Sequence, residues 1–150
     1  MKINLEINNL TQSPIENISF EKIAEEILRE VANFLSEKEV SLSMAWIGED
    51  EMKKLNSAYR QKEAVTDILS FPEFKNLEEI RQIKEKKIFL GELILCYDDI
   101  EKYAKQEGLN LKEELTKVFA HGLLHLLGFD HGKEMFSFQE RIIAKTTFIK

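Results

Sequence analysis

All three histidines of this 150-residue chain lie in one short stretch, HGLLHLLGFDH at residues 121–131. His121 and His125 are four residues apart, so on a helix their imidazole rings lie on one face, one turn apart. Gly128 can end that helix in a left-handed conformation. The chain can then turn back, so that His131 approaches the same point from the far side. Three imidazole nitrogens and an open fourth position form the ligand set of a catalytic zinc site. The spacing therefore predicts a metal centre.

The alternative for each histidine is a hydrogen-bonded core residue, which is the commoner role of a single histidine on an apolar helix. The clustering of all three favours a metal site instead. Zinc suits imidazole nitrogen, although nickel, cobalt or copper would also accept three histidines. Structural zinc sites usually have four protein ligands and favour cysteine. The single cysteine, Cys96, lies in the apolar run FLGELILC, where we expect a buried side chain. We therefore expect one zinc ion at an open, catalytic site.

The spacing of the histidines and the glycine also matches the metzincin protease motif HExxHxxGxxH. In that motif the second residue is a glutamate, which acts as the general base on metal-bound water. This chain has Gly122 at that position, so peptide hydrolysis is disfavoured. Three neutral histidines leave the ion its full charge, which can lower the pKa of bound water from about 15.7 toward about 7. Hydroxide can then form with weaker help from the protein.

Length and composition predict a single domain over residues 1–150. A chain of this size buries well over half of its unfolded surface, and 43% hydrophobic with 32% charged residues is ordinary for a globular protein. One cysteine and the lack of an apolar run of about 20 residues favour a cytoplasmic protein without a membrane partner. The formal net charge of −6 disfavours a general basic surface for nucleic acid. Contacts with RNA must therefore come from specific residues or a local patch.

Hydrophobic periodicity predicts the elements that position the histidines. Strands are expected at residues 2–7, 40–46, 66–71 and 88–97, the last being the most apolar and therefore central. Helices are expected at 20–35 with Ser19 as the N-cap, from about 49, and at 99–106, 111–127 and 133–146. The charged run at 75–87 is expected to be an exposed, partly helical connection. Strands first and helices later predict an α+β domain with one mixed sheet of about four strands packed against helices. The metal site lies at the end of the long late helix.

The histidine stretch resembles the signature HGxLHLxGYDH of the YbeY-type endoribonucleases, with Phe129 in place of the usual tyrosine. A second block agrees, because LNSAYR at 55–60 and TDILSFP at 66–72 are similar to the family's LNxxYR and TDVLSFP. Glu92 stands where the family usually has aspartate. The acidic C-terminal helix of the family is matched by Glu134, Met135 and Glu140. The chain departs from the family at Gln61, Glu63 and Val65, where glycine, aspartate and proline are usual.

The resemblance implies a single-domain α+β metalloprotein that binds zinc through His121, His125 and His131. It implies a bacterial endoribonuclease acting on single-stranded RNA, with roles in ribosomal RNA processing and ribosome quality control. Maturation of the 3′ end of 16S rRNA is part of that role. The implied partners are ribosomal RNA and the ribosome or its proteins. Arg60 matches the family arginine that serves the RNA substrate.

Two further side chains are candidates for the catalytic machinery. The planar guanidinium of Arg60 can bind two phosphate oxygens as charge develops on them, or it can serve the helix dipole as an exposed helix-end residue. Asp130 can orient a histidine or steer the water, or it can hold a turn. The locally basic residues can follow an RNA backbone, but the glutamates among them favour a solvated connection. These basic residues are Arg81, Lys84, Lys86 and Lys87.

Three functions are compatible with these residues. A zinc-dependent endoribonuclease is favoured, with attack either by metal-bound hydroxide or by the RNA's own 2′-hydroxyl. The second is a ribosome-assembly factor whose metal is structural. The third is a metalloprotease, which the glycine at position 122 disfavours.

Overall fold

The computed structural model describes residues 1–15, 18–130 and 132–146. Within these residues, four strands form one mixed sheet in the order β1-β2-β4-β3. The strands are β1 (Lys2–Asn9), β2 (Glu39–Trp46), β3 (Ile68–Pro72) and β4 (Lys87–Leu95). β1, β2 and β4 run parallel, and β3 pairs with β4 in the antiparallel direction. This confirms the predicted mixed sheet and the internal position of the apolar strand.

Six α-helices and one short 3₁₀ turn lie in the described part of the chain. They are α1 (Phe20–Val31), the 3₁₀ turn (Asn33–Leu35), α2 (Glu49–Arg60), α3 (Leu77–Arg81), α4 (Tyr97–Glu107), α5 (Leu111–Leu126) and α6 (Lys133–Thr146). The first helix is shorter than predicted, because its apolar face continues into the 3₁₀ turn through buried Leu35. Ser19 occupies the N-cap position of α1, but its side chain makes no capping hydrogen bond.

The predicted fourth strand is too long at its C-terminal end. β4 ends at Leu95, and the backbone N–H of Cys96 donates to the carbonyl of Asp67. Tyr97 then begins α4 instead of extending the strand. The apolar run in the sequence continues across this boundary, because Tyr97 is also buried at the start of the helix. The run therefore does not show where the strand ends.

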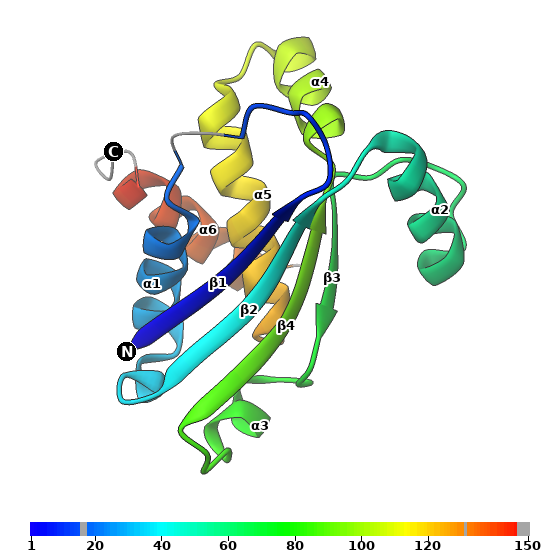
Figure 1. Cartoon of the computed structure of the whole chain (residues 1–150). Helices are drawn as coiled ribbons and strands as arrows, with labels where there is room; N and C mark the ends of the chain where they lie inside the picture. Colours follow the sequence, from blue (N-terminus) through cyan, green and yellow to red (C-terminus); the bar gives the residue numbers. More distant parts are fainter. Residues whose placement is uncertain (16–17, 131, 147–150) are drawn as a thin grey trace.

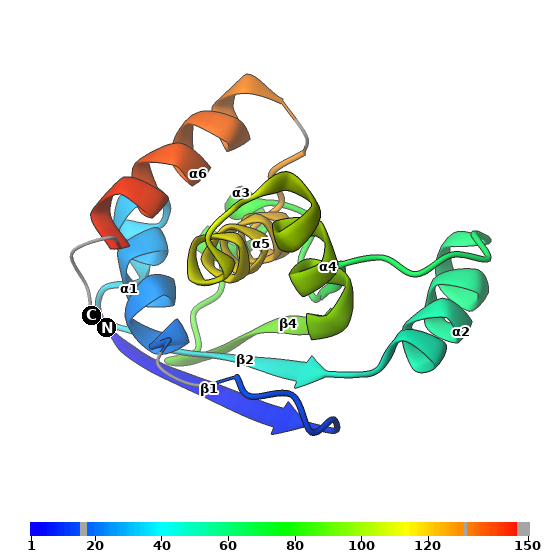
Figure 2. The same ribbon diagram turned by 90° about the horizontal axis from the view of Figure 1, so that it is seen from above.

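The helices α1 and α5 cover one face of the sheet, as Figures 1 and 2 show. Alternate side chains of β2 point into this layer and are buried: Val40, Leu42, Met44 and Trp46. A second, smaller apolar cluster consists of Met52 on α2 with Ile47, Leu69 and Cys96. Burial raises the pKa of the Cys96 thiol, in agreement with the expected buried role. α5 packs on β3 and β4 of the sheet, and α4 and α6 both pack on α5.

The charged run at 75–87 is exposed and partly helical, as predicted, with α3 at its centre. The Arg81 guanidinium lies over the Phe34 ring at 4.4 Å from its centroid and pairs with Glu78 at 3.6 Å. This arginine therefore contributes to local packing. An RNA contact by the rest of the run stays a prediction.

No helix in the described ranges has the length and apolarity that crossing a membrane requires.

Candidate metal centre

The last two turns of α5 place His121 and His125 side by side. Both rings are half-buried, their centroids are 4.5 Å apart, and their planes are nearly perpendicular. The two Nε2 atoms are 3.1 Å apart. The predicted helix thus brings both imidazoles to one point, as the four-residue spacing requires.

The other ring nitrogen of each histidine is directed to an oxygen acceptor. The Nδ1 of His125 lies 2.9 Å from the carbonyl oxygen of Phe129, and the Nδ1 of His121 lies 3.3 Å from the Oε1 of Gln139. A carbonyl oxygen only accepts hydrogen bonds, so the tautomer with the proton on Nδ1 satisfies both contacts. In the neutral ring the lone pair is then on Nε2. In this tautomer both Nε2 lone pairs face the same region, which is the arrangement that metal ligation needs.

The turn after α5 provides one of these acceptors. Gly128 has a φ of 90°, its N–H donates to the carbonyl of His125, and the N–H of Phe129 donates to the carbonyl of Leu124. This pair of hydrogen bonds is the Schellman ending of a helix. The reversal brings the Phe129 carbonyl back over the helix to the His125 ring. The predicted glycine stop is confirmed, and it also orients a histidine.

These residues fit a zinc ion. In a tetrahedral site with Zn–N bonds of about 2.0–2.1 Å, two ligand nitrogens lie about 3.3 Å apart, close to the 3.1 Å between the two Nε2 atoms. The third expected ligand, His131, lies outside the described residues. Among the described residues no group of three metal-ligating side chains comes together. The described part of the centre is therefore the pair formed by His121 and His125.

Gln139 is a site residue that the sequence reasoning missed. It comes from α6, is 4% exposed, and holds the His121 ring through its amide oxygen. The sequence offered only a weak signal, a polar residue on the inward face of a helix that also buries Met135 and Ile142. A buried amide at such a position requires a hydrogen-bond partner.

Replacing Gln139 with methionine is expected to lower zinc affinity about 10- to 100-fold. Methionine has a similar length but no oxygen acceptor, so the tautomer of His121 is no longer fixed. Competition with a fluorescent zinc chelator measures the affinity. The Gln139→Glu variant keeps an oxygen acceptor and is the matched control. Unchanged affinity in the methionine variant would show that this hydrogen bond does not support the ligand.

Gly122 is explained by packing. A Cβ atom at this position would lie 2.4 Å from the Cδ1 of Ile68 on β3 and 3.0 Å from the Cδ2 of Leu93 on β4. The glycine therefore lets α5 approach the sheet closely. A side chain at residue 122 would point into this contact. A glutamate placed as in the metzincin motif would have to displace the Ile68 and Leu93 side chains, which disfavours it at this position.

Arg60 lies on a helix away from the histidine pair, and Asp130 follows the residue whose carbonyl contacts His125. Both side chains are exposed. Arg60 is the last residue of α2, which stands apart from α5 in Figures 1 and 2. Within the described ranges neither side chain forms a hydrogen bond or an ion pair, and the acceptors for the two rings are Gln139 and the Phe129 carbonyl. Phosphate binding by Arg60 and orientation of a histidine or water by Asp130 stay predictions.

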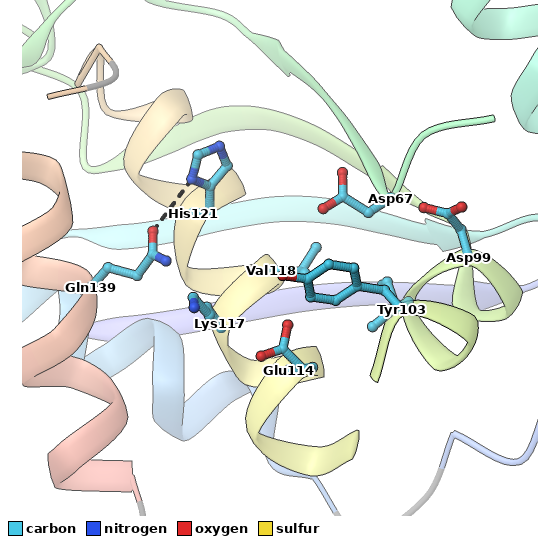
Figure 3. Close-up of a pocket in the computed structure, with 9 residues that line it drawn as sticks. Asp67, Asp99, Tyr103, Glu114, Lys117, Val118, His121 and Gln139 are labelled. Carbon is cyan, nitrogen blue, oxygen red and sulfur yellow. Dashed lines mark hydrogen bonds between the residues drawn. The ribbon is translucent and has the colours of Figure 1, made fainter. Parts of the chain in front are cut away.

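A pocket of about 280 Å³ opens beside His121 (Figure 3). Three elements contribute carboxylates to it: Asp67 just before β3, Asp99 on α4 and Glu114 on α5. The pKa of Asp99 is raised, first because burial disfavours the charged form and second because the carboxylates of Asp67 and Glu49 lie nearby. The wall of the pocket is therefore electronegative.

The fold and this site together define a class, the small α+β proteins whose late helix presents histidines of a candidate metal centre. The family model described as endoribonuclease YbeY matches residues 6–147. The chain therefore belongs to the endoribonuclease YbeY family and is an RNA-cleaving hydrolase. This confirms the family predicted from the histidine signature and the arginine block.

Relatives named endoribonuclease YbeY align over most of the chain. The protein from Staphylococcus saprophyticus is 37% identical over 112 residues, covering 71% of this chain and 72% of the relative. The protein from Acholeplasma laidlawii is 31% identical over 146 residues, covering 94% and 96%. The solution structure of TM1509 from Thermotoga maritima is similar with a TM-score of 0.58 and 25% identity, covering 95% of this chain and 88% of that one.

Proposed function

We propose that this protein is a zinc-dependent endoribonuclease that cleaves single-stranded RNA. The proposed zinc dependence is supported by the imidazole pair of His121 and His125. Their Nε2 atoms are 3.1 Å apart, and their Nδ1 atoms lie against oxygen acceptors. In this arrangement two neutral rings direct their lone pairs to one region, which favours a shared cation.

The proposed roles of the chain's own residues follow from these contacts. His121, His125 and His131 hold the ion, Gln139 and the Phe129 carbonyl fix the first two rings, and Arg60 binds a phosphate through its guanidinium. When bound, zinc supplies Lewis acidity toward a phosphodiester. Gly122 lets α5 pack closely against Ile68 and Leu93 of the sheet.

We further propose ribosomal RNA as the substrate, including the 3′ end of 16S rRNA, in the cytoplasm and in contact with the ribosome or its proteins. The sequence resemblance supports this proposal. The net charge of −6 also argues that binding depends on specific contacts rather than on general attraction to RNA.

The test uses full-length protein, elemental analysis and a defined single-stranded RNA labelled at one end. We expect about one zinc per chain, cleavage that stops after chelation, and recovery when zinc is added back. Mapping of the product ends distinguishes water from the 2′-hydroxyl as the nucleophile, because only the latter leaves a cyclic phosphate. Full cleavage by the metal-stripped protein would contradict the zinc dependence. Ribosome binding without any cleavage would favour an assembly factor.

A further inference from the structure

The pocket beside His121 is lined by Glu114, an acidic residue that is largely buried. Glu114 is 8% exposed, and Figure 3 shows its carboxylate directed from α5 toward the ring of Tyr103. Throughout the described part of the chain, no hydrogen bond or ion pair reaches this carboxylate. Its oxygens are accessible from the pocket, so a ligand that brings donors can bind them.

A purely structural role for Glu114 is also conceivable. Glu114 lies in the first turn of α5, where a negative charge interacts favourably with the helix dipole. Glu113 lies in the same turn and is exposed, so it can serve the dipole without loss of solvation. The dipole therefore does not account for the burial of Glu114 or for its position on the wall of the pocket.

The charges of the pocket select the kind of ligand. With the carboxylates of Asp67, Asp99 and Glu114 on its wall, the pocket repels a phosphate group. A metal ion held by these carboxylates is disfavoured, because among the described residues no three of them come close enough together to bind one. A neutral group with hydrogen-bond donors and flat apolar faces fits better. Nucleobases have both features.

The side chains on α5 favour guanine. Glu114 and Lys117 are three residues apart, hence neighbours on one helix face, and both line the pocket. A carboxylate accepts two hydrogen bonds side by side, and an ammonium only donates. The Watson–Crick edge of guanine has two adjacent donors, N1–H and N2–H, beside one acceptor, O6. Adenine, cytosine and uracil each have only one donor group on this edge.

The other walls suit a planar base. Ile100 and Val118 are apolar lining residues, and Tyr103, which is 51% exposed, lies at the opening. Aromatic side chains at such positions stack on unpaired bases of single-stranded RNA. His121 lines the same pocket, so a base bound here lies next to the histidine pair.

We propose that this pocket is a base-specificity site that binds an unpaired guanine next to the cleaved bond, with Glu114 as the residue that accepts from N1–H and N2–H. The proposal rests on the proposed function, because it names the substrate feature that the same site selects.

Binding and cleavage are measured separately with the full-length, metal-loaded protein. The binding probes are dye-labelled 2′-O-methyl pentanucleotides UUXUU, in which X is G, A, C, U or inosine. We expect the G probe to bind about 10- to 100-fold more tightly than the A, C and U probes. Inosine lacks the N2 amino group and should bind with intermediate affinity. Unmodified RNAs of the same sequences report cleavage.

The variant Glu114→Gln keeps the size of the side chain but replaces one acceptor oxygen with a donor. We expect it to lose the preference for G while its circular dichroism and melting temperature stay close to those of the wild type. Glu113→Gln, on the same helical turn, is the matched control and should keep the preference.

The outcomes separate the two proposals. Preference for G without cleavage of any RNA would support the pocket and contradict the proposed function. Cleavage with equal affinity for all probes would overturn the pocket and leave the function intact. Binding of Mg²⁺ alone that depends on Glu114, without base preference, would overturn the base site in favour of a cation site.

Discussion

Replacing His125 with alanine is expected to abolish stable metal binding and to lower kcat/KM for RNA cleavage by on the order of a thousandfold or more. His125 contributes one of the two described imidazoles, and its ring is fixed by the Phe129 carbonyl at 2.9 Å. Its loss removes a proposed ligand nitrogen and leaves His121 without the facing Nε2 atom at 3.1 Å. Elemental analysis and initial rates on a defined RNA measure the two effects.

The chelated wild-type protein is the control for this variant, because it lacks the metal but keeps every side chain. Both proteins should show the same residual rate. Adding zinc should restore the wild type and leave His125→Ala inactive. Cleavage by the variant at a substantial fraction of the wild-type rate would show that this histidine is not part of the catalytic centre.

Replacing Gly128 with alanine is expected to lower the free energy of unfolding by about 3–5 kcal/mol. The backbone at Gly128 has a φ of 90°, and a Cβ atom there would lie 2.4 Å from the Cα of Asn76 and 2.7 Å from the carbonyl oxygen of Lys75. These are backbone atoms that cannot rotate away, so the turn or the neighbouring loop must move. Urea unfolding followed by circular dichroism measures the loss.

Gly108 provides a matched control for this prediction. It also follows a helix with a left-handed backbone, at a φ of 66°, but a Cβ atom there would meet nothing within 4 Å. Gly108→Ala should therefore cost only about 1–2 kcal/mol, from backbone strain alone. Equal losses of unfolding free energy in the two variants would mean that the contact with residues 75 and 76 does not contribute to stability.

The Gly128 variant should also weaken zinc binding at temperatures where it is still folded. The turn at Gly128 carries the Phe129 carbonyl to His125, so a shifted turn removes the acceptor that fixes the ring. Gly108→Ala, whose turn lies at the other end of α5, should leave zinc affinity unchanged. The stability and the metal affinity are thus predicted to change together in one variant only.

The sequence by itself determined the elements that carry the histidines. α5 was predicted over 111–127 and lies at Leu111–Leu126, and Gly128 ends it with a positive φ as its position indicated. The four strands and the C-terminal helix were also predicted, with errors of a few residues at their ends. Hydrophobic periodicity and a helix-ending glycine act over one or two turns of chain, so local sequence is sufficient to reveal them.

The tertiary structure alone decided which side chains surround the histidines. Gln139 reaches His121 only because α6 packs on α5. The carboxylates of Asp67, Asp99 and Glu114 line one pocket because α4, α5 and the segment before β3 converge there. Gly122 could be read from the sequence as a missing catalytic base, whereas the structure places it against Ile68 and Leu93 of the sheet, which a side chain would displace. Such contacts join residues far apart in the chain. They depend on how complete helices and strands pack, which no local pattern of residues encodes.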